Sequence, residues 1–165
     1  MALLVGFIGC ALHWDLKFAK KKEDTSLTAE NIVEMLKKFG ISSIDVQKEG
    51  IMFGQEGSVY TLDCSDHPVI RFGNVGRMED GVNLEIAKKA ALEFNQDFVN
   101  ATVQVEDNRM CYITSVTFAD DIQTLYNALP SMMQYLEIAR YHYLKRVEKS
   151  LLQPSQLRHS QDTKD

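Results

Sequence analysis

Residues 120–152, DDIQTLYNALPSMMQYLEIARYHYLKRVEKSLL, form a long amphipathic stretch near the end of the chain. Its apolar residues follow one another at steps of three and four: Ile122, Leu125, Leu129, Met132, Leu136, Ala139, Tyr143 and Val147. This spacing predicts a helix of about seven turns with one apolar side. Asp120, with Gln123 three residues later, predicts the N-terminal cap and its capping-box partner. Such a helix must pack on a surface that the rest of the chain supplies.

The preceding residues predict that surface, a small sheet with two further helices. Thr28 is expected to cap a helix that ends at Phe39, because Gly40 offers a C-terminal stop. Short apolar or β-branched runs separated by Gly and Asp predict strands. These runs are residues 44–46, 51–53, 59–64 and 68–72, and later residues 101–105 and 110–118.

A second helix is expected over residues 83–98, from apolar residues at three- and four-residue steps. The glycines of Gly73-Asn74-Val75-Gly76 and the sequence Glu79-Asp80-Gly81 predict a loop in front of this helix. The polar residues 153–165 predict a disordered tail. In coarse order the chain is α-β-β-β-α-β-β-α, an α+β protein.

The composition is that of one soluble domain and excludes several classes of function. The chain has 165 residues and a formal net charge of −5, so it lacks the basic surface that nucleic acid requires. Its three cysteines, Cys10, Cys64 and Cys111, provide neither an even disulfide framework nor a C-x-x-C pair. We therefore expect reduced thiols and a cytoplasmic protein, with no nucleic-acid partner and no cofactor.

The N-terminal segment, residues 1–25, differs from the rest of the chain. Residues 2–12 are apolar or small, and they are followed by His13, Trp14 and then four lysines among residues 17–22. An apolar core followed by Trp and positive charge is typical of a helix that enters the cytoplasm from a membrane. Residues 2–14 are short for a span, because about 30 Å of hydrocarbon needs about 20 residues. A membrane anchor and a flexible or core-packed extension both remain open.

Three passages resemble the YbjN-like family of small bacterial proteins, often called sensory transduction regulators. They are LTAENIVEMLKKFGI (27–41), VIRFGNVGRMEDGVNLEIAKKAALEFN (69–95) and VQVEDNRMCYITSVTF (103–118). The resemblance covers residues 26–152 and implies a type III secretion chaperone-like fold, a single curved antiparallel sheet packed by helices. It also implies a protein that binds protein partners and is commonly dimeric. Pro130 and the apolar N-terminus are not part of this pattern.

Three groups of residues were candidates for chemistry, and each has a simpler explanation. Asp63, Cys64, Asp66 and His67 crowd one turn but lack the ligand spacing of a zinc site. The sequence from Gly73 to Gly76 has the G-x-x-G form of a nucleic-acid clamp, but acidic residues follow at once. Glu79, Asp80 and Glu85 fall where negative charge favours a helix start. We expect no enzyme, no metal and no catalytic residues.

The outer side of the last helix is the more informative feature. At about 100° per residue from Leu136, Ile138 and Tyr141 lie away from the apolar side, and Tyr135 and Leu144 flank it. These four residues are expected to contact a protein partner or a second copy of the chain. The predicted function is a non-enzymatic binding module, regulator- or chaperone-like, tethered at the cytoplasmic face of a membrane. An accessory subunit of a membrane complex and a small enzyme using the Asp63–His67 turn are the alternatives.

Overall fold

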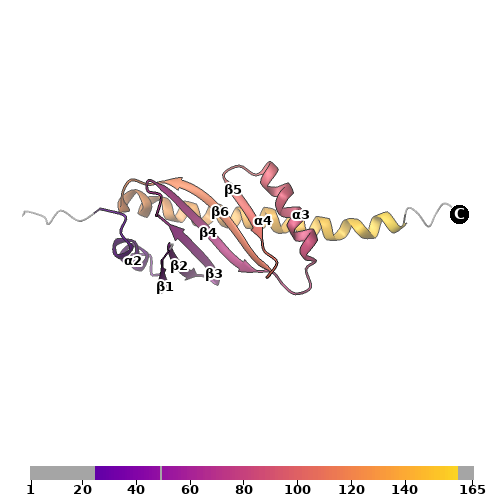
Figure 1. The fold of residues 1–165 in the computed structure, drawn as a ribbon, viewed down its shortest axis with the longest axis horizontal. Coiled ribbons are helices and arrows are strands. Elements are labelled where there is room, and N and C mark those ends of the chain that lie inside the picture. The colour runs from indigo at the N-terminus through magenta and orange to yellow at the C-terminus, as the bar shows by residue number, and fades with distance from the viewer. Residues whose placement is uncertain (1–24, 49, 160–165) are drawn as a thin grey trace, which may run out of the picture.

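The computed structural model of the protein describes residues 25–48 and 50–159, and for residues 153–159 it describes the backbone alone (Figure 1). The predicted anchor, within residues 1–25, lies almost entirely outside the described residues. The elements, in chain order, are α2 (Ala29–Lys38), β1 (Ser43–Gln47), β2 (Gly50–Gln55), β3 (Ser58–Asp63), β4 (Val69–Arg77), α3 (Leu84–Asp97), β5 (Ala101–Val105), β6 (Met110–Phe118) and α4 (Ile122–His159).

The strands form one sheet in the order β1-β2-β3-β4-β6-β5, and every neighbouring pair is antiparallel. The predicted class, α+β with a single antiparallel sheet packed by helices, is confirmed. The first group of strands has four members, β1 to β4, where the coarse order counted three. The two later strands and the second helix lie where the sequence placed them.

The long helix α4 runs along one face of the sheet (Figure 1). Its predicted apolar side is the one that is buried: Leu125, Leu129, Leu136, Ala139, Tyr143 and Val147. Ile122 and Met132 are partly buried against the same core. On the sheet, three aromatic rings form part of this core, because Phe53, Tyr60 and Phe72 stack with centroids 5.5–6.1 Å apart. The apolar side of the helix and the apolar face of the sheet thus bury each other.

The predicted loop from Gly73 to Gly76 is wrong, because these residues continue β4. Gly73 pairs with Thr61 of β3, and a Cβ added at Gly73 would come within 2.5 Å of the Thr61 hydroxyl oxygen. The glycine therefore serves close approach between strands rather than a turn. The buried Asn74 donates a side-chain N–H to the Val59 carbonyl oxygen at 3.4 Å.

The helix starts follow the predicted capping chemistry, with one shift. Thr28, the predicted cap, accepts a backbone N–H through its side chain, and so does Asn83, which was predicted only as the approximate start of the second helix. The predicted cap at Asp120 is wrong by one residue, because Asp121 accepts the Thr124 N–H at 2.7 Å. The predicted capping-box partner, Gln123, bonds to Asn127 instead. Either aspartate has the right chemistry for a cap, and the chain geometry selects Asp121.

The predicted tail also needs correction, since α4 continues as a helix through His159. The residues from Gln153 to His159 are mostly polar, which indicated disorder, but Gln, Leu and Arg are also good helix formers. Residues 160–165 lie outside the described part of the chain. Within that part, none of the helices combines the length and the apolar content that a membrane crossing requires.

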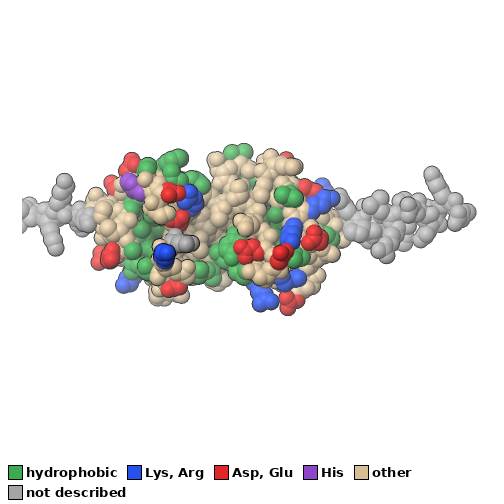
Figure 2. Space-filling model, in the orientation of Figure 1, with side chains coloured by type: hydrophobic (Ala, Val, Ile, Leu, Met, Phe, Trp, Pro, Cys, Tyr) green, Lys and Arg blue, Asp and Glu red, His purple; other side chains and the backbone are tan. Residues whose placement is uncertain are grey.

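The two edges of the sheet end differently. At the β5 edge, Asn95 of α3 accepts the Val103 N–H at 2.7 Å and donates to the Val103 carbonyl oxygen at 2.9 Å. A helix side chain thus takes the place that another strand would have. At the opposite edge, β1 pairs with β2 alone among the described elements. Figure 2 shows few hydrophobic or charged side chains in the middle of the surface, and both kinds gather to either side.

Candidate functional site

The outer side of α4 exposes three of the four predicted contact residues. Ile138 is 45% exposed, Tyr141 59% and Leu144 48%. Tyr135, the fourth, is partly buried: its ring packs near Phe98, and its hydroxyl donates to the backbone carbonyl oxygen of Val99. Tyr135 therefore already has a contact within its own chain. The other three offer apolar surface that the fold leaves exposed.

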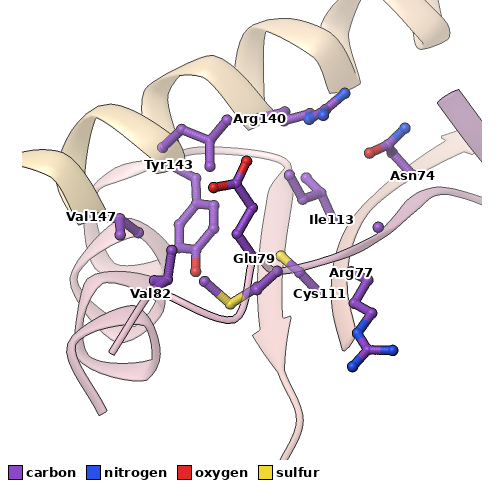
Figure 3. A pocket seen from close by; sticks show the side chains of 12 residues that line it. Asn74, Arg77, Glu79, Val82, Cys111, Ile113, Arg140, Tyr143 and Val147 are labelled. Atoms are coloured by element: carbon purple, nitrogen blue, oxygen red, sulfur yellow. The ribbon is translucent and has the colours of Figure 1, made fainter. Parts of the chain in front are cut away.

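Leu144 borders a cavity, and Tyr141 is exposed about one turn before it on the same helix. The cavity has a volume of about 330 Å³ and lies between α4, the ends of β4 and β6, and the loop that leads into α3 (Figure 3). Its apolar walls are formed by Met78, Val82, Ile113, Tyr143, Leu144 and Val147. Leu144 belongs to both surfaces, so the exposed side of α4 and the cavity are continuous. We call Tyr141, Leu144 and the cavity together the α4 surface.

Three charged side chains line the cavity: Arg77, Glu79 and Arg140. Arg77 Nη2 lies 3.7 Å from Asp80 Oδ1, and Arg140 Nη1 lies 3.6 Å from Glu137 Oε2. In Figure 3 the Glu79 carboxylate points toward α4, whereas the guanidinium group of Arg77 points away from it. The cavity is therefore apolar on its walls and charged at its rim.

Glu137 joins α4 to the sheet beside this cavity. Its Oε1 accepts the Tyr60 hydroxyl at 2.8 Å and the Ser58 hydroxyl at 3.1 Å. Burial, together with the neighbouring Glu137 carboxylate, raises the pKa of Tyr60 to about 12. Tyr60 therefore stays protonated and donates its hydrogen bond at any physiological pH. The network fastens α4 against β3 and gives no sign of acid–base chemistry.

Arg109 shapes the loop at the cavity, although reasoning from the sequence did not single it out. The residue has a positive φ of 69° in the turn before β6. Its Nη2 donates to the Glu79 carbonyl oxygen and, at 2.7 Å, to the Val82 carbonyl oxygen. One side chain thereby holds both ends of the Glu79–Val82 turn. In the sequence, Arg109 only follows the turn-forming residues Glu106-Asp107-Asn108, and the folded chain is needed to show what its guanidinium reaches.

The Asp63–His67 turn is held by its own polar contacts. Arg71 forms ion pairs with Asp63 and Asp66, and Asp63 also accepts the Ser65 N–H at 2.8 Å. His67 Nε2 donates to the Asp120 carbonyl oxygen at 3.0 Å. Across the part of the chain that the structure describes, no three His, Cys, Asp or Glu side chains gather as a metal site. These contacts explain the turn as a structural feature.

Neither thiol within the described residues is set up as a nucleophile. Burial raises the pKa of the Cys64 thiol to about 11, and it raises that of Cys111 to about 11 as well. Because the thiolate is the reactive form, both groups are almost entirely unreactive at neutral pH. Glu79, Asp80 and Glu85, the other predicted candidates, lie in the loop and first turn of α3, and Asp80 is engaged by Arg77 and Arg109.

Comparison with known proteins finds similarity of fold alone. No family model matches the chain, and no curated protein matches it. Among solved structures, an uncharacterised protein from Methanothermobacter thermautotrophicus is similar at a TM-score of 0.52 and 11% identity, over 73% of this chain and 96% of that one. At that identity the similarity establishes a shared fold and nothing about activity.

The similar structures also include the two kinds of protein that the sequence resembles. YbjN from E. coli, a candidate transcription regulator, has a TM-score of 0.45 at 11% identity, over 76% of this chain and 93% of that one. The HopA1–SchA chaperone–effector complex has a TM-score of 0.42 at 8% identity, over 70% and 98%. The expected resemblance to YbjN and to the type III secretion chaperone-like fold is confirmed as a resemblance.

Proposed function

We propose that residues 26–152 form a non-enzymatic, regulator- or chaperone-like module that binds a protein partner through the α4 surface. The observation that carries the proposal is the exposure of Tyr141 and Leu144 at 59% and 48%, beside an apolar cavity. Aromatic and aliphatic side chains next to a pocket are typical anchors of protein interfaces. The partner is either a different protein or a second copy of this chain, with Ile138 and Tyr135 at the rim of the contact.

The enzyme alternative has less support. A catalytic site requires a nucleophile or base within hydrogen-bond reach of a group that orients it. The protonated thiols, the Asp63–His67 turn bound to Arg71, and the carboxylates at the start of α3 do not form such a set. Binding therefore explains the α4 surface better than catalysis does.

Photo-crosslinking in the cell of origin tests the binding function. A photoreactive amino acid placed at position 141 or 144 of the full-length protein should give a discrete adduct whose mass identifies the partner or a second copy. Lys37, an exposed residue on α2, is the control position and should not give that adduct. Equal adducts at all three positions, or none at positions 141 and 144, would refute binding through the α4 surface.

We further propose that residues 2–14 tether this module to the cytoplasmic face of a membrane. The support is their sequence alone, an apolar run followed by Trp14 and lysines. An apolar anchor resists high salt, whereas an electrostatic one is screened, with a Debye length of about 3 Å at 1 M. The full-length protein should therefore stay with membranes at high salt, and Phe7→Asp together with Ile8→Asp should release it. A full-length protein that is soluble at low salt would refute the tether.

The same double variant separates this proposal from an accessory subunit of a membrane complex. If the N-terminal segment is the part that binds, the variant loses its partner. If the α4 surface binds, the variant leaves the membrane but keeps its crosslink at position 141.

A further inference from the structure

The cavity of the α4 surface contains an acidic group that has no partner among the described residues. The Glu79 carboxylate points into the cavity toward α4 (Figure 3), and no hydrogen bond or ion pair reaches it from residues 25–48 or 50–152. Its neighbour Asp80 has two cationic partners, Arg77 at 3.7 Å and Arg109 at 3.6 Å. The carboxylate of Glu79 is thus the one acidic group of the cavity lining, and it is free to receive a positive charge.

The two arginines of the cavity do not neutralise Glu79. Arg140 reaches toward the sheet, where its Nη1 lies 3.6 Å from Glu137 Oε2 and 3.4 Å from Ser58 Oγ. Arg77 reaches Asp80 at the outer rim. Arg77 shares Asp80 with Arg109, and Arg140 is paired with Glu137, so the exposed carboxylate of Glu79 is the charge of the cavity lining that has no counterion among the described residues.

The position of Glu79 is set before any ligand arrives. Arg109 donates to the main-chain carbonyl oxygens of Glu79 and Val82, so both ends of the turn that presents the carboxylate are bound to the turn between β5 and β6. These contacts use the backbone of Glu79 and leave its side chain uncommitted. A preorganised turn lowers the cost of binding, because the ligand need not order the backbone that carries Glu79.

The walls around the carboxylate select the kind of cation. Val82, Ile113, Leu144 and Val147 give a cavity of about 330 Å³ whose surface is mostly apolar. A small hydrated ion gains nothing from such walls, whereas Lys and Arg lay an apolar stem on apolar surface and keep the charge at its end. Arg adds a fork of N–H donors that matches both carboxylate oxygens.

We infer that the cavity takes an arginine side chain of the partner protein, with its guanidinium on Glu79 and its stem against Val82 and Val147. An apolar residue next to that arginine in the partner would then rest on Leu144 and Tyr141. This inference rests on the proposed binding function and specifies the partner segment as basic and apolar.

Titration of the full-length protein with short peptides, followed by NMR, tests the inference. The probe is acetyl-leucyl-arginine amide, and acetyl-leucyl-citrulline amide is its neutral control of nearly the same shape. The arginine peptide should shift the methyl signals of Val82, Ile113 and Val147 in a saturable way. The citrulline peptide should bind at least about tenfold more weakly, which corresponds to about 1.4 kcal/mol.

Two matched variants locate the binding site on the protein. Glu79→Gln keeps the shape of the side chain, and its affinity for the arginine peptide should fall by about tenfold. Its melting temperature should stay near that of the wild type. Glu34→Gln, on the exposed side of α2, should leave the affinity unchanged. Raising the salt concentration should weaken the binding of the arginine peptide and leave the binding of the citrulline peptide nearly unaffected.

Several outcomes would overturn the inference. Equal affinity for the two peptides, no effect of Glu79→Gln, or no shift at millimolar peptide would each do so. Stronger binding of acetyl-leucyl-glutamate amide would assign the cavity to an anion held by Arg77 and Arg140 instead. If the crosslink at position 141 persists in any of these cases, the binding function stands and only the arginine pocket fails.

Discussion

The two sides of α4 differ in what they do for the protein. Leu136 and Tyr143 on the inner side are buried completely or nearly so and pack on the sheet, whereas Ile138 and Tyr141 on the outer side remain about half exposed. Large apolar side chains occur on both sides, so the identity of a single residue does not tell the two sides apart. The difference is that the inner side packs on the sheet, whereas Tyr141 on the outer side contacts His142 and Lys145 of its own helix. Apolar surface that the fold does not use is the surface available to another molecule.

The largest expected effect is on the inner side. Leu136→Ala should lower the free energy of unfolding by about 2–5 kcal/mol, because it removes buried methyl groups and leaves a cavity in the core. Chemical denaturation of the full-length protein measures this change. Ile138→Ala, two residues away on the outer side, is the control and should change it by less than about 0.5 kcal/mol. Equal losses in the two variants would remove the distinction between the sides.

A smaller effect on stability is expected at Asn95, which is exposed like Tyr141 but forms hydrogen bonds within the fold. Asn95→Ala removes two hydrogen bonds to Val103 at the edge of the sheet and should cost about 1–2 kcal/mol of stability. Gln96→Ala, at the next exposed position of α3, should cost almost nothing. If Asn95→Ala were equally neutral, the covered edge of the sheet would be as available to partners as the β1 edge.

A pH-dependent effect is expected at the start of α4. The backbone N–H of Thr124 and its side-chain contact lower the pKa of Asp121 below its ordinary value. A carboxyl group with a lowered pKa stabilises the fold above its unfolded pKa of about 3.9, and this contribution is lost as the pH falls through the lower folded value. Asp121→Asn keeps a capping oxygen but does not titrate.

Denaturation of both proteins as a function of pH checks this point. The wild type should be the more stable of the two at neutral pH, and the difference should vanish as Asp121 becomes protonated. A difference that persists in strong acid would show that Asp121 acts through its shape rather than through its charge.

The sequence predicted most of the fold because the elements have local signals. Thr28, Asn83 and the spacing from Leu125 to Val147 each depend on residues within a few turns, and all three proved informative. The failures arose where a distant residue decides. The sequence around Gly73 predicts a turn, and only the structure shows Thr61 beside it on the next strand. In the same way, the role of Arg109 depends on its contacts with Glu79 and Val82, which are distant in the sequence.

The candidate site was predicted in part for the same reason. Helical phase placed Tyr141 and Ile138 outside the core, and both are exposed. Helical phase could not show that Tyr135 is bound to Val99, or that Leu144 borders a cavity, because these contacts join segments that are far apart in the sequence. The role of an acidic residue such as Glu79 could not be predicted from the sequence, because it depends on the apolar residues that the fold brings around it.

The smallest effect on stability and the most direct test come from Tyr141→Ala. Its melting temperature should match that of the wild type, because exposed substitutions usually stay within about 0.5 kcal/mol. Its association with the partner identified by crosslinking, or with itself, should weaken by about 2 kcal/mol or more in sedimentation, as truncation of a central interface tyrosine does. A Tyr141→Ala protein that melts early yet associates normally would contradict the account, because Tyr141 would then belong to the core of the monomer.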